Sequence, residues 1–161
     1  MLTDFPRLSR CLTVMPLVLL LAGCAGMSGD GITDLTLRIV VSDGVNPDRS
    51  GRPSPVFLQL YELRDPDSFR AARYLDVYRD PPGTLGSAYL STSELGPLYP
   101  GTTVEETLRL MPTAVAVGVL GEFNRYRDMD TPMDLVEFAP GEDATVEVRL
   151  TARGLSLRLE Q

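Results

Sequence analysis

The sequence predicts an all-β protein, an antiparallel two-sheet β-sandwich with one short added helix. Apolar and polar side chains alternate along four segments, as in strands with one buried and one solvent-facing side. These segments are 35–41, 104–110, 146–150 and 155–159. Two further runs, 56–63 and 114–123, are apolar on both faces and are expected to form central strands. A sandwich is the simplest way to bury such strands in one domain.

The remaining elements complete a count of seven or eight strands. A further strand is expected around 135–138. The last two strands are separated only by residues 151–154, which is short enough for a hairpin.

One segment departs from the strand pattern and predicts a helix of two or three turns. Residues 65–68 (Asp-Pro-Asp-Ser) supply capping side chains and a proline suited to a first turn. Apolar positions then recur at helical spacing, at Ala71, Tyr74, Leu75 and Tyr78. We expect this Tyr and Leu face to pack on the sandwich, with its tyrosines serving as core or helix-packing aromatics. We expect the helix to end at the Pro-Pro-Gly that follows.

The N-terminus has the layout of a secretory signal. Arg7 and Arg10 precede an uncharged, mostly apolar run over 12–21, and small residues follow it. A helix that crosses a bilayer needs about 20 apolar residues, so this run is too short to be one. Residues 1–23 are therefore predicted to be a signal peptide.

The end of this signal resembles a bacterial lipobox. In Leu-Ala-Gly-Cys, ending at Cys24, the cysteine would be acylated and become the new N-terminus. The alternative is ordinary cleavage that leaves Cys24 a free thiol. With acylation, residues 24–34 form a lipid-attached tether and 35–161 the folded domain. Ala25 after the cysteine favours the outer membrane.

The composition excludes most catalytic chemistries. All 15 basic residues are arginine, there is no histidine, and no cysteine lies in the body of the chain. Imidazole bases, lysine amines and thiolate nucleophiles are therefore missing, and no cofactor, metal or enzymatic activity is expected. The net charge of −7 argues against a nucleic-acid partner. The acidic residues over 127–134 lack the spacing of a calcium loop, so a solvated turn is expected there.

The candidate functional segment is the 14-residue connection over 42–55. It holds three prolines and two glycines, and a connection this long is usually functional or disordered. Prolines restrict the loop before binding, and its two arginines suit a protein interface. The candidate partner-binding residues are Asn46, Pro47, Asp48, Arg49, Ser50, Gly51, Arg52 and Pro53. The alternative is a mobile connection with no role.

Several blocks, in order, resemble the outer-membrane lipoprotein of bacterial type VI secretion systems, TssJ. The resemblance covers most of residues 20–150, although Met133-Asp134 stands where the family often has Trp-Arg. The matching blocks are the lipobox at Cys24, Asn46-Pro47, 51–56, Tyr61 with Leu63, Phe69, 75–80, Leu85-Gly86, Pro100-Gly101 and 114–123.

The resemblance implies a transthyretin-like sandwich, lipid-anchored to the outer membrane and facing the periplasm. It implies binding to the periplasmic C-terminal domain of a TssM-like inner-membrane protein, and through it an indirect link to a TssL-like protein. These proteins form a trans-envelope complex, and the family's first interstrand loop, here 46–53, is a main partner contact. The alternatives are an unrelated lipoprotein binding module or assembly factor with the same sandwich, and a periplasmic hydrolase that uses two carboxylates.

Overall fold

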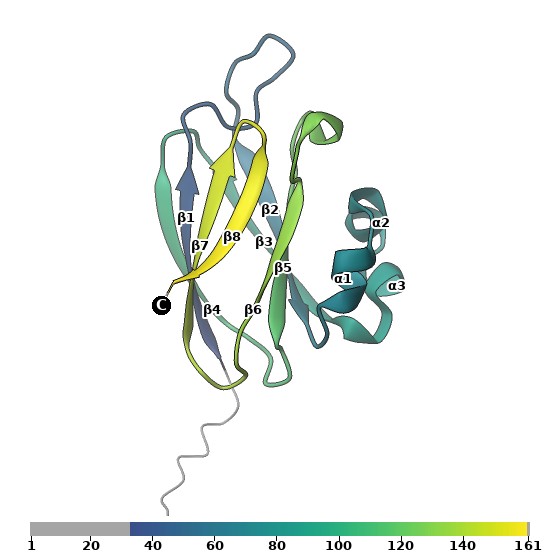
Figure 1. The fold of residues 1–161 in the computed structure, drawn as a ribbon. Coiled ribbons are helices and arrows are strands. Elements are labelled where there is room, and N and C mark those ends of the chain that lie inside the picture. Colours follow the sequence, from purple (N-terminus) through teal and green to yellow (C-terminus); the bar gives the residue numbers. More distant parts are fainter. Residues whose placement is uncertain (1–32, 161) are drawn as a thin grey trace, which may run out of the picture.

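The computed structural model describes residues 33–160, whose strands form two four-stranded sheets packed face to face (Figure 1). In the first sheet the order is β4 (Thr103–Arg109), β1 (Asp34–Val41), β7 (Ala144–Thr151), β8 (Gly154–Glu160). In the second it is β3 (Tyr89–Leu98), β2 (Val56–Leu63), β5 (Ala116–Gly121), β6 (Met133–Glu137). Strands β1 and β7 pair in parallel and all other paired strands are antiparallel, which confirms the predicted sandwich.

The alternating segments build the core between the sheets. In β1, Leu35, Leu37 and Ile39 are fully buried, and the side chains between them face outward. Leu37 lies opposite Val146 of β7, and Ile39 opposite Val148, so the two strands present one continuous apolar face. Removing this apolar surface from water is the main stabilising contribution to the domain.

The two runs that are apolar on both faces are central strands, as predicted. Leu58 and Leu60 of β2 point into the core between the sheets, whereas Tyr61 and Leu63 belong to a second apolar cluster on the other face of the sheet. Strand β5 is buried along its whole length. Both strands are covered twice because a helical segment packs on the outer face of their sheet (Figure 1).

The prediction of one continuous helix is wrong. The segment forms α1 (Asp67–Ala71), α2 (Tyr74–Arg79), α3 (Pro81–Leu85) and the 3-10 turn η1 (Gly86–Ala88). The backbone is extended at Ala72 and Arg73, where ψ is 152° and 145°. The Pro-Pro-Gly does not end the helical segment, because Asp80 accepts a hydrogen bond from Gly83 N and caps the start of α3.

The predicted packing face of this segment is only partly right: Tyr74 packs against the apolar cluster on the sheet, but two of the other expected positions do not. Ala71 is exposed and Tyr78 is 47% exposed. The buried side chains are instead Phe69, Val77 and Leu85, one from each short helix. Since each helix has its own direction, a single helical period cannot describe the buried positions.

Strand β3 is missing from the sequence-based assignment. Its residues include the polar run Ser91-Thr92-Ser93 and Gly96-Pro97, and Leu98 is its only buried residue. As an edge strand with an irregular register against β2, it shows no clean alternation.

The predicted signal peptide and nearly all of the predicted tether lie outside the described residues. Within the described residues, the chain contains no helix with the length and apolar character needed to span a bilayer. Thr33, directly before β1, is buried, and its carbonyl accepts a hydrogen bond from Leu110 N. The beginning of β1 is thereby fixed to the β4–β5 connection.

Candidate functional site: the β1–β2 loop and its surroundings

All eight candidate residues lie in the β1–β2 connection, which extends beyond the end of the sandwich opposite the start of β1 (Figure 1). The base of this connection is buried, although its composition, with three prolines, two glycines and almost no apolar side chains, is typical of a surface segment. Val45 is fully buried in the core between the sheets and Asn46 is 3% exposed. The exposed residues of the connection are Asp43 and Gly44 before this base, and residues 49–53 with Pro55 after it.

Asn46 joins this loop to the β5–β6 connection. Its Nδ2 donates to Pro55 O at 2.6 Å, and its Oδ1 accepts from Asn124 N at 2.7 Å. The backbone φ of Asn46 is +47°, a conformation that asparagine tolerates better than most residues. Asn46 is thus too buried to meet a partner directly, and it acts by positioning the loop.

Asp48 organises the exposed tip of the loop. Its carboxylate accepts hydrogen bonds from Ser50 N at 2.7 Å, Ser50 Oγ at 2.6 Å and Arg52 N at 3.0 Å. These bonds, led by the one from the Ser50 hydroxyl, hold the pKa of the Asp48 carboxyl well below its usual range. Gly51 has a φ of +81°, a backbone conformation that glycine adopts at no steric cost, so the turn within this network favours glycine.

The two arginines of the loop differ in their contacts. The Arg52 guanidinium pairs with Asp48, with 3.0 Å between Nη2 and Oδ2. Among the residues that the structure describes, no ion pair involves Arg49. Pro47 and Pro53 flank the network and restrict the backbone on both sides. The loop is therefore preorganised and presents Arg49 as a cation that has no carboxylate partner among residues 33–160.

A stack of three tyrosines lies next to this loop, beyond Asn124. Tyr126, in the 3-10 turn η2 (Tyr126–Asp128), stacks on Tyr74 with ring centroids 4.7 Å apart, and Tyr74 stacks on Tyr78 at 6.2 Å. The Tyr74 hydroxyl donates to Gly121 O at 2.9 Å, and burial raises the pKa of Tyr74. The sequence gives no signal for this stack, because α2 and η2 are brought together only by the fold.

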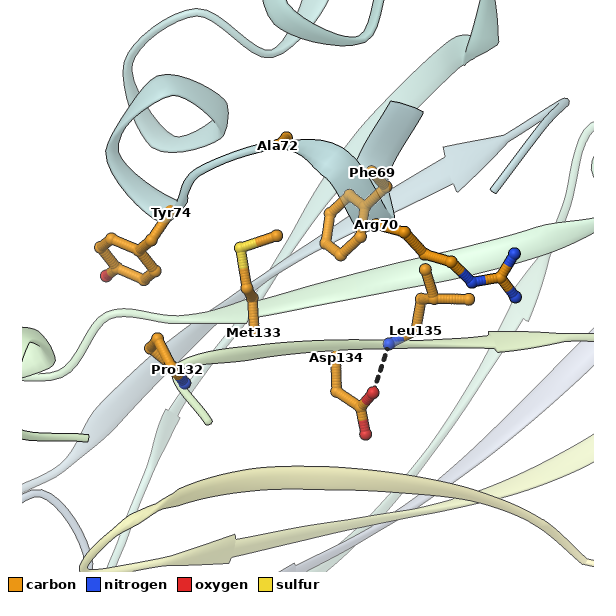
Figure 2. A pocket seen from close by; sticks show the side chains of 8 residues that line it. All are labelled: Phe69, Arg70, Ala72, Tyr74, Pro132, Met133, Asp134 and Leu135. Atoms are coloured by element: carbon orange, nitrogen blue, oxygen red, sulfur yellow. Dashed lines mark hydrogen bonds between the residues drawn. The ribbon is translucent and has the colours of Figure 1, made fainter. Parts of the chain in front are cut away.

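A hollow of about 460 Å³ separates the first two helices from β6 (Figure 2). Met133 and Leu135 point toward the helices, where Phe69 and Tyr74 form the other wall. Asp134 points the opposite way, toward β8, and accepts a hydrogen bond from Leu157 N at 2.9 Å. At Met133-Asp134 the chain therefore has one helix-packing side chain and one sheet-linking side chain.

The carboxylates over 127–134 serve structural contacts. Asp128 pairs with Arg125 at 2.6 Å. Asp130 accepts from two nitrogens of Arg153 at 2.6 and 2.8 Å, and these bonds lower the pKa of Asp130. Across residues 33–160 no cluster of three or more potential ligand side chains could hold a metal ion. The three carboxylates of this region, Asp134 included, thus have partners within the fold.

Comparison with known proteins identifies the family. The family model described as type VI secretion lipoprotein (VasD, EvfM, TssJ) matches residues 33–153. No curated protein matches the sequence significantly.

Solved structures share the fold. The type VI secretion lipoprotein TssJ1 of Pseudomonas aeruginosa is 19% identical with a TM-score of 0.73, over 80% of this chain and 97% of that one. Lip of Serratia marcescens, described as a membrane-bound component of the type VI secretion system, is 20% identical with a TM-score of 0.65, over 80% and 98%. A chain in a structure described as the TssM C-terminal domain from EAEC is 22% identical with a TM-score of 0.56, over 81% and 98%.

The family match spans three quarters of the 161-residue chain, and the observed sandwich is the fold of the solved relatives. Both findings confirm the resemblance drawn from the sequence blocks. The chain belongs to the type VI secretion lipoprotein family that includes TssJ.

Proposed function

We propose that this chain is a periplasm-facing lipoprotein, anchored in the outer membrane through lipid on Cys24, that helps to build the membrane complex of a type VI secretion system. Its partner is the periplasmic C-terminal domain of a TssM-like inner-membrane protein, which links it indirectly to a TssL-like protein. The observation that carries the proposal is the family match over residues 33–153. The protein acts by binding, with no cofactor and no catalytic step.

The direction of β1 supports this arrangement. Cys24 precedes β1, so an anchor there holds the start of the strand toward the membrane. The β1–β2 loop lies at the other end of the sandwich (Figure 1). The eight residues of β1 span about 26 Å, at about 3.3 Å per residue. The loop therefore faces away from the anchoring membrane, where a partner from the inner membrane can reach it.

The structure of the loop supports its role as a contact. The hydrogen bonds to Asp48 order residues 48–52 before any partner is bound, which lowers the entropy cost of binding. Arg49 has no carboxylate partner in the described part of the chain. Arginine is enriched among residues that dominate interface energies. The choice of the TssM domain as partner is supported by the EAEC structure, because a chain similar to this one occurs in it.

The anchor is tested by Cys24→Ser. Without the thiol, lipid cannot be attached, so we expect loss of palmitate incorporation, loss of outer-membrane fractionation and loss of type VI secretion. Two acyl chains are needed for durable anchoring, because each buried CH₂ contributes about 0.8 kcal/mol. A Cys24→Ser protein that still fractionates with the outer membrane would refute the anchor.

The partner is tested by calorimetric titration of the chain, purified in detergent, with the periplasmic domain of the TssM-like protein from the same organism. Arg49→Glu is the variant of choice, because Arg52→Glu would also disrupt the Asp48 network. Saturable binding that Arg49→Glu weakens at least tenfold, about 1.4 kcal/mol, is expected.

Arg64→Glu is the matched control for this titration. Arg64 is likewise exposed and without an ion pair in the described residues, but it follows β2 at the other end of the strand. We expect less than a twofold change. Absence of binding by the unaltered chain would contradict the proposed partner. Equal effects of the two substitutions would contradict the proposal that the loop is the contact.

A further inference from the structure

The tyrosine stack and the arginines around it form a surface that the proposed loop contact does not use. We call it the tyrosine–arginine surface; it consists of Tyr74, Tyr78 and Arg79 of α2, Arg73 directly before α2, and Tyr126 and Arg127 of η2. Two hollows of about 260 and 410 Å³ lie beside the stacked rings, and Tyr74, Leu75 and Tyr126 line both. Tyr78 is 47% exposed although it stacks on Tyr74. An aromatic ring held in place yet open to solvent is suited to contact a partner.

The tyrosine–arginine surface carries arginines that form no ion pair with a carboxylate of the described residues. Of the 13 arginines in the described part of the chain, eight form ion pairs with carboxylates. The five that form none are Arg49, Arg64, Arg79, Arg127 and Arg158. Arg79 and Arg127 belong to the tyrosine–arginine surface, and Arg49 to the neighbouring loop. In the described part of the chain, three of the five arginines without an ion pair thus lie on adjoining elements, whereas Asp76 and Glu122 are the carboxylates that line the two hollows.

Arg127 is oriented by its aromatic neighbour. Its Nε donates to the Tyr126 hydroxyl at 2.9 Å, and its guanidinium carbon lies 5.6 Å from the centre of the Tyr126 ring. The terminal nitrogens of the guanidinium form no ion pair within residues 33–160. A planar guanidinium fixed in this way can accept a carboxylate with two parallel hydrogen bonds.

The surface is continuous with the β1–β2 loop. Asn124, two residues before Tyr126, donates its backbone N–H to Asn46 Oδ1 at 2.7 Å. Its side-chain nitrogen donates to Asn46 O at 3.4 Å. The base of the loop and the base of η2 are therefore connected directly, and one partner can contact both.

We infer that the tyrosine–arginine surface is a second contact for the partner that the loop binds, and that it takes an acidic segment of that protein. The inference rests on the proposed function for the existence of that partner. In the bound state, carboxylates of the segment pair with Arg79 and Arg127, and an apolar side chain enters the hollows beside Tyr74. The acidic chain disfavours nucleic acid, and the surface adjoins the loop at the end of the sandwich remote from the start of β1.

Photo-crosslinking in cells tests the surface independently of the partner's identity. A photoreactive amino acid replaces Tyr78, Arg49 or, as control, Arg64 in the full chain, and crosslinked peptides are identified by mass spectrometry. We expect positions 49 and 78 to crosslink to the same protein. The peptide captured at position 78 should be rich in Asp and Glu, and position 64 should not crosslink to this protein. A product from position 49 alone, or lipid or nucleic acid at position 78, would overturn the inference.

The identity of the crosslinked protein separates the two proposals. If positions 49 and 78 reach one acidic segment in a protein unlike TssM, the inference stands and the proposed partner is wrong. If position 49 reaches the TssM-like domain and position 78 reaches nothing, the proposed function stands and the inference fails.

Charge reversal measures the strength of the contact. We expect the double variant Arg79→Glu/Arg127→Glu to weaken binding to the crosslinked protein at least tenfold and to reduce the salt dependence of the association rate. The matched control Arg64→Glu/Arg158→Glu makes the same change in net charge with residues that also form no ion pair in the described region. Equal weakening by both doubles would assign the effect to overall charge and overturn the contact.

Discussion

The two connections that flank β2 are ordered in opposite ways. The β1–β2 loop holds its exposed tip with short polar contacts, nearly all of them made to Asp48. The β2–β3 connection, residues 64–88, is instead held by apolar side chains that pack on the sheet's outer face, and Phe69 is the largest of those that are fully buried. Residues at the loop tip can therefore be substituted without affecting the core, whereas the buried residues of the helices cannot.

This difference separates stability from binding. A substitution in the helical connection removes buried apolar surface, which lowers the free energy of unfolding. A substitution at the loop tip removes contacts among exposed groups, which contribute little to stability but set the conformation that a partner meets. The predictions below test this separation.

The largest effect is expected for Phe69→Ala. The Phe69 ring is 1% exposed and lies over Gly118, where a Cβ would come within 2.5 Å of it. Truncation leaves a cavity between α1 and β5, so we expect the free energy of unfolding to fall by about 3–5 kcal/mol. Urea denaturation measures it. Tyr78→Ala, on the same segment but half-exposed, should cost less than about 1 kcal/mol; similar losses for both variants would break the comparison.

A smaller loss is expected for Asn46→Ala, at the base of the loop. The substitution leaves Pro55 O and Asn124 N without their partner and puts alanine at a φ of +47°. An unsatisfied buried group costs about 1–3 kcal/mol, and the backbone conformation adds about 1 kcal/mol. Asn46→Gly removes the hydrogen bonds without the backbone strain and should be the milder change by urea denaturation. If alanine and glycine are equally destabilising, the positive φ at position 46 does not lower the free energy of unfolding of the alanine variant.

The sandwich was predictable because apolar and polar side chains alternate along β1, β7 and β8, and this alternation shows which side chains form the core. The helices were not, because the breaks at Ala72 and Arg73 depend on fitting Phe69 and Val77 to a sheet made of distant segments. Strand β3 was missed because its hydrogen bonds to β2, and not its side chains, define it.

The candidate loop was predictable from its prolines, glycines and length. Its internal division was not predictable, because Val45 enters the core between the sheets and Asn46 bonds to Asn124, 78 residues away in the chain. The tyrosine stack was missed for the same reason. Tyr74 and Tyr126 are 52 residues apart, and neither shows a local pattern that indicates the other.

Asp48→Ala is expected to change binding but not stability. The loop tip loses the acceptor that orders Ser50 and Arg52, so the partner must order it on binding. We expect affinity for the TssM-like domain to fall about three- to tenfold, with the free energy of unfolding in urea unchanged within the error of its measurement. Asp43→Ala, which alters an exposed aspartate of the same connection, is the control and should change neither quantity.

The smallest effect concerns pH, and it follows from the Asp48 carboxylate. The hydrogen bonds from Ser50 and Arg52 lower its pKa from the ordinary value of 3.8. A lowered pKa means that ionised Asp48 favours the ordered loop. That contribution is fully present above about pH 4, and it is lost only as the pH falls through the lowered pKa. Amide chemical shifts of Ser50 and Arg52 should therefore stay constant from pH 8 to pH 4 and change only below that range. Asp48→Asn should abolish the low-pH step. A midpoint near pH 3.8 would mean that the loop tip is not ordered by this carboxylate. The β1–β2 loop and the helical connection would then differ only in how deeply their side chains are buried.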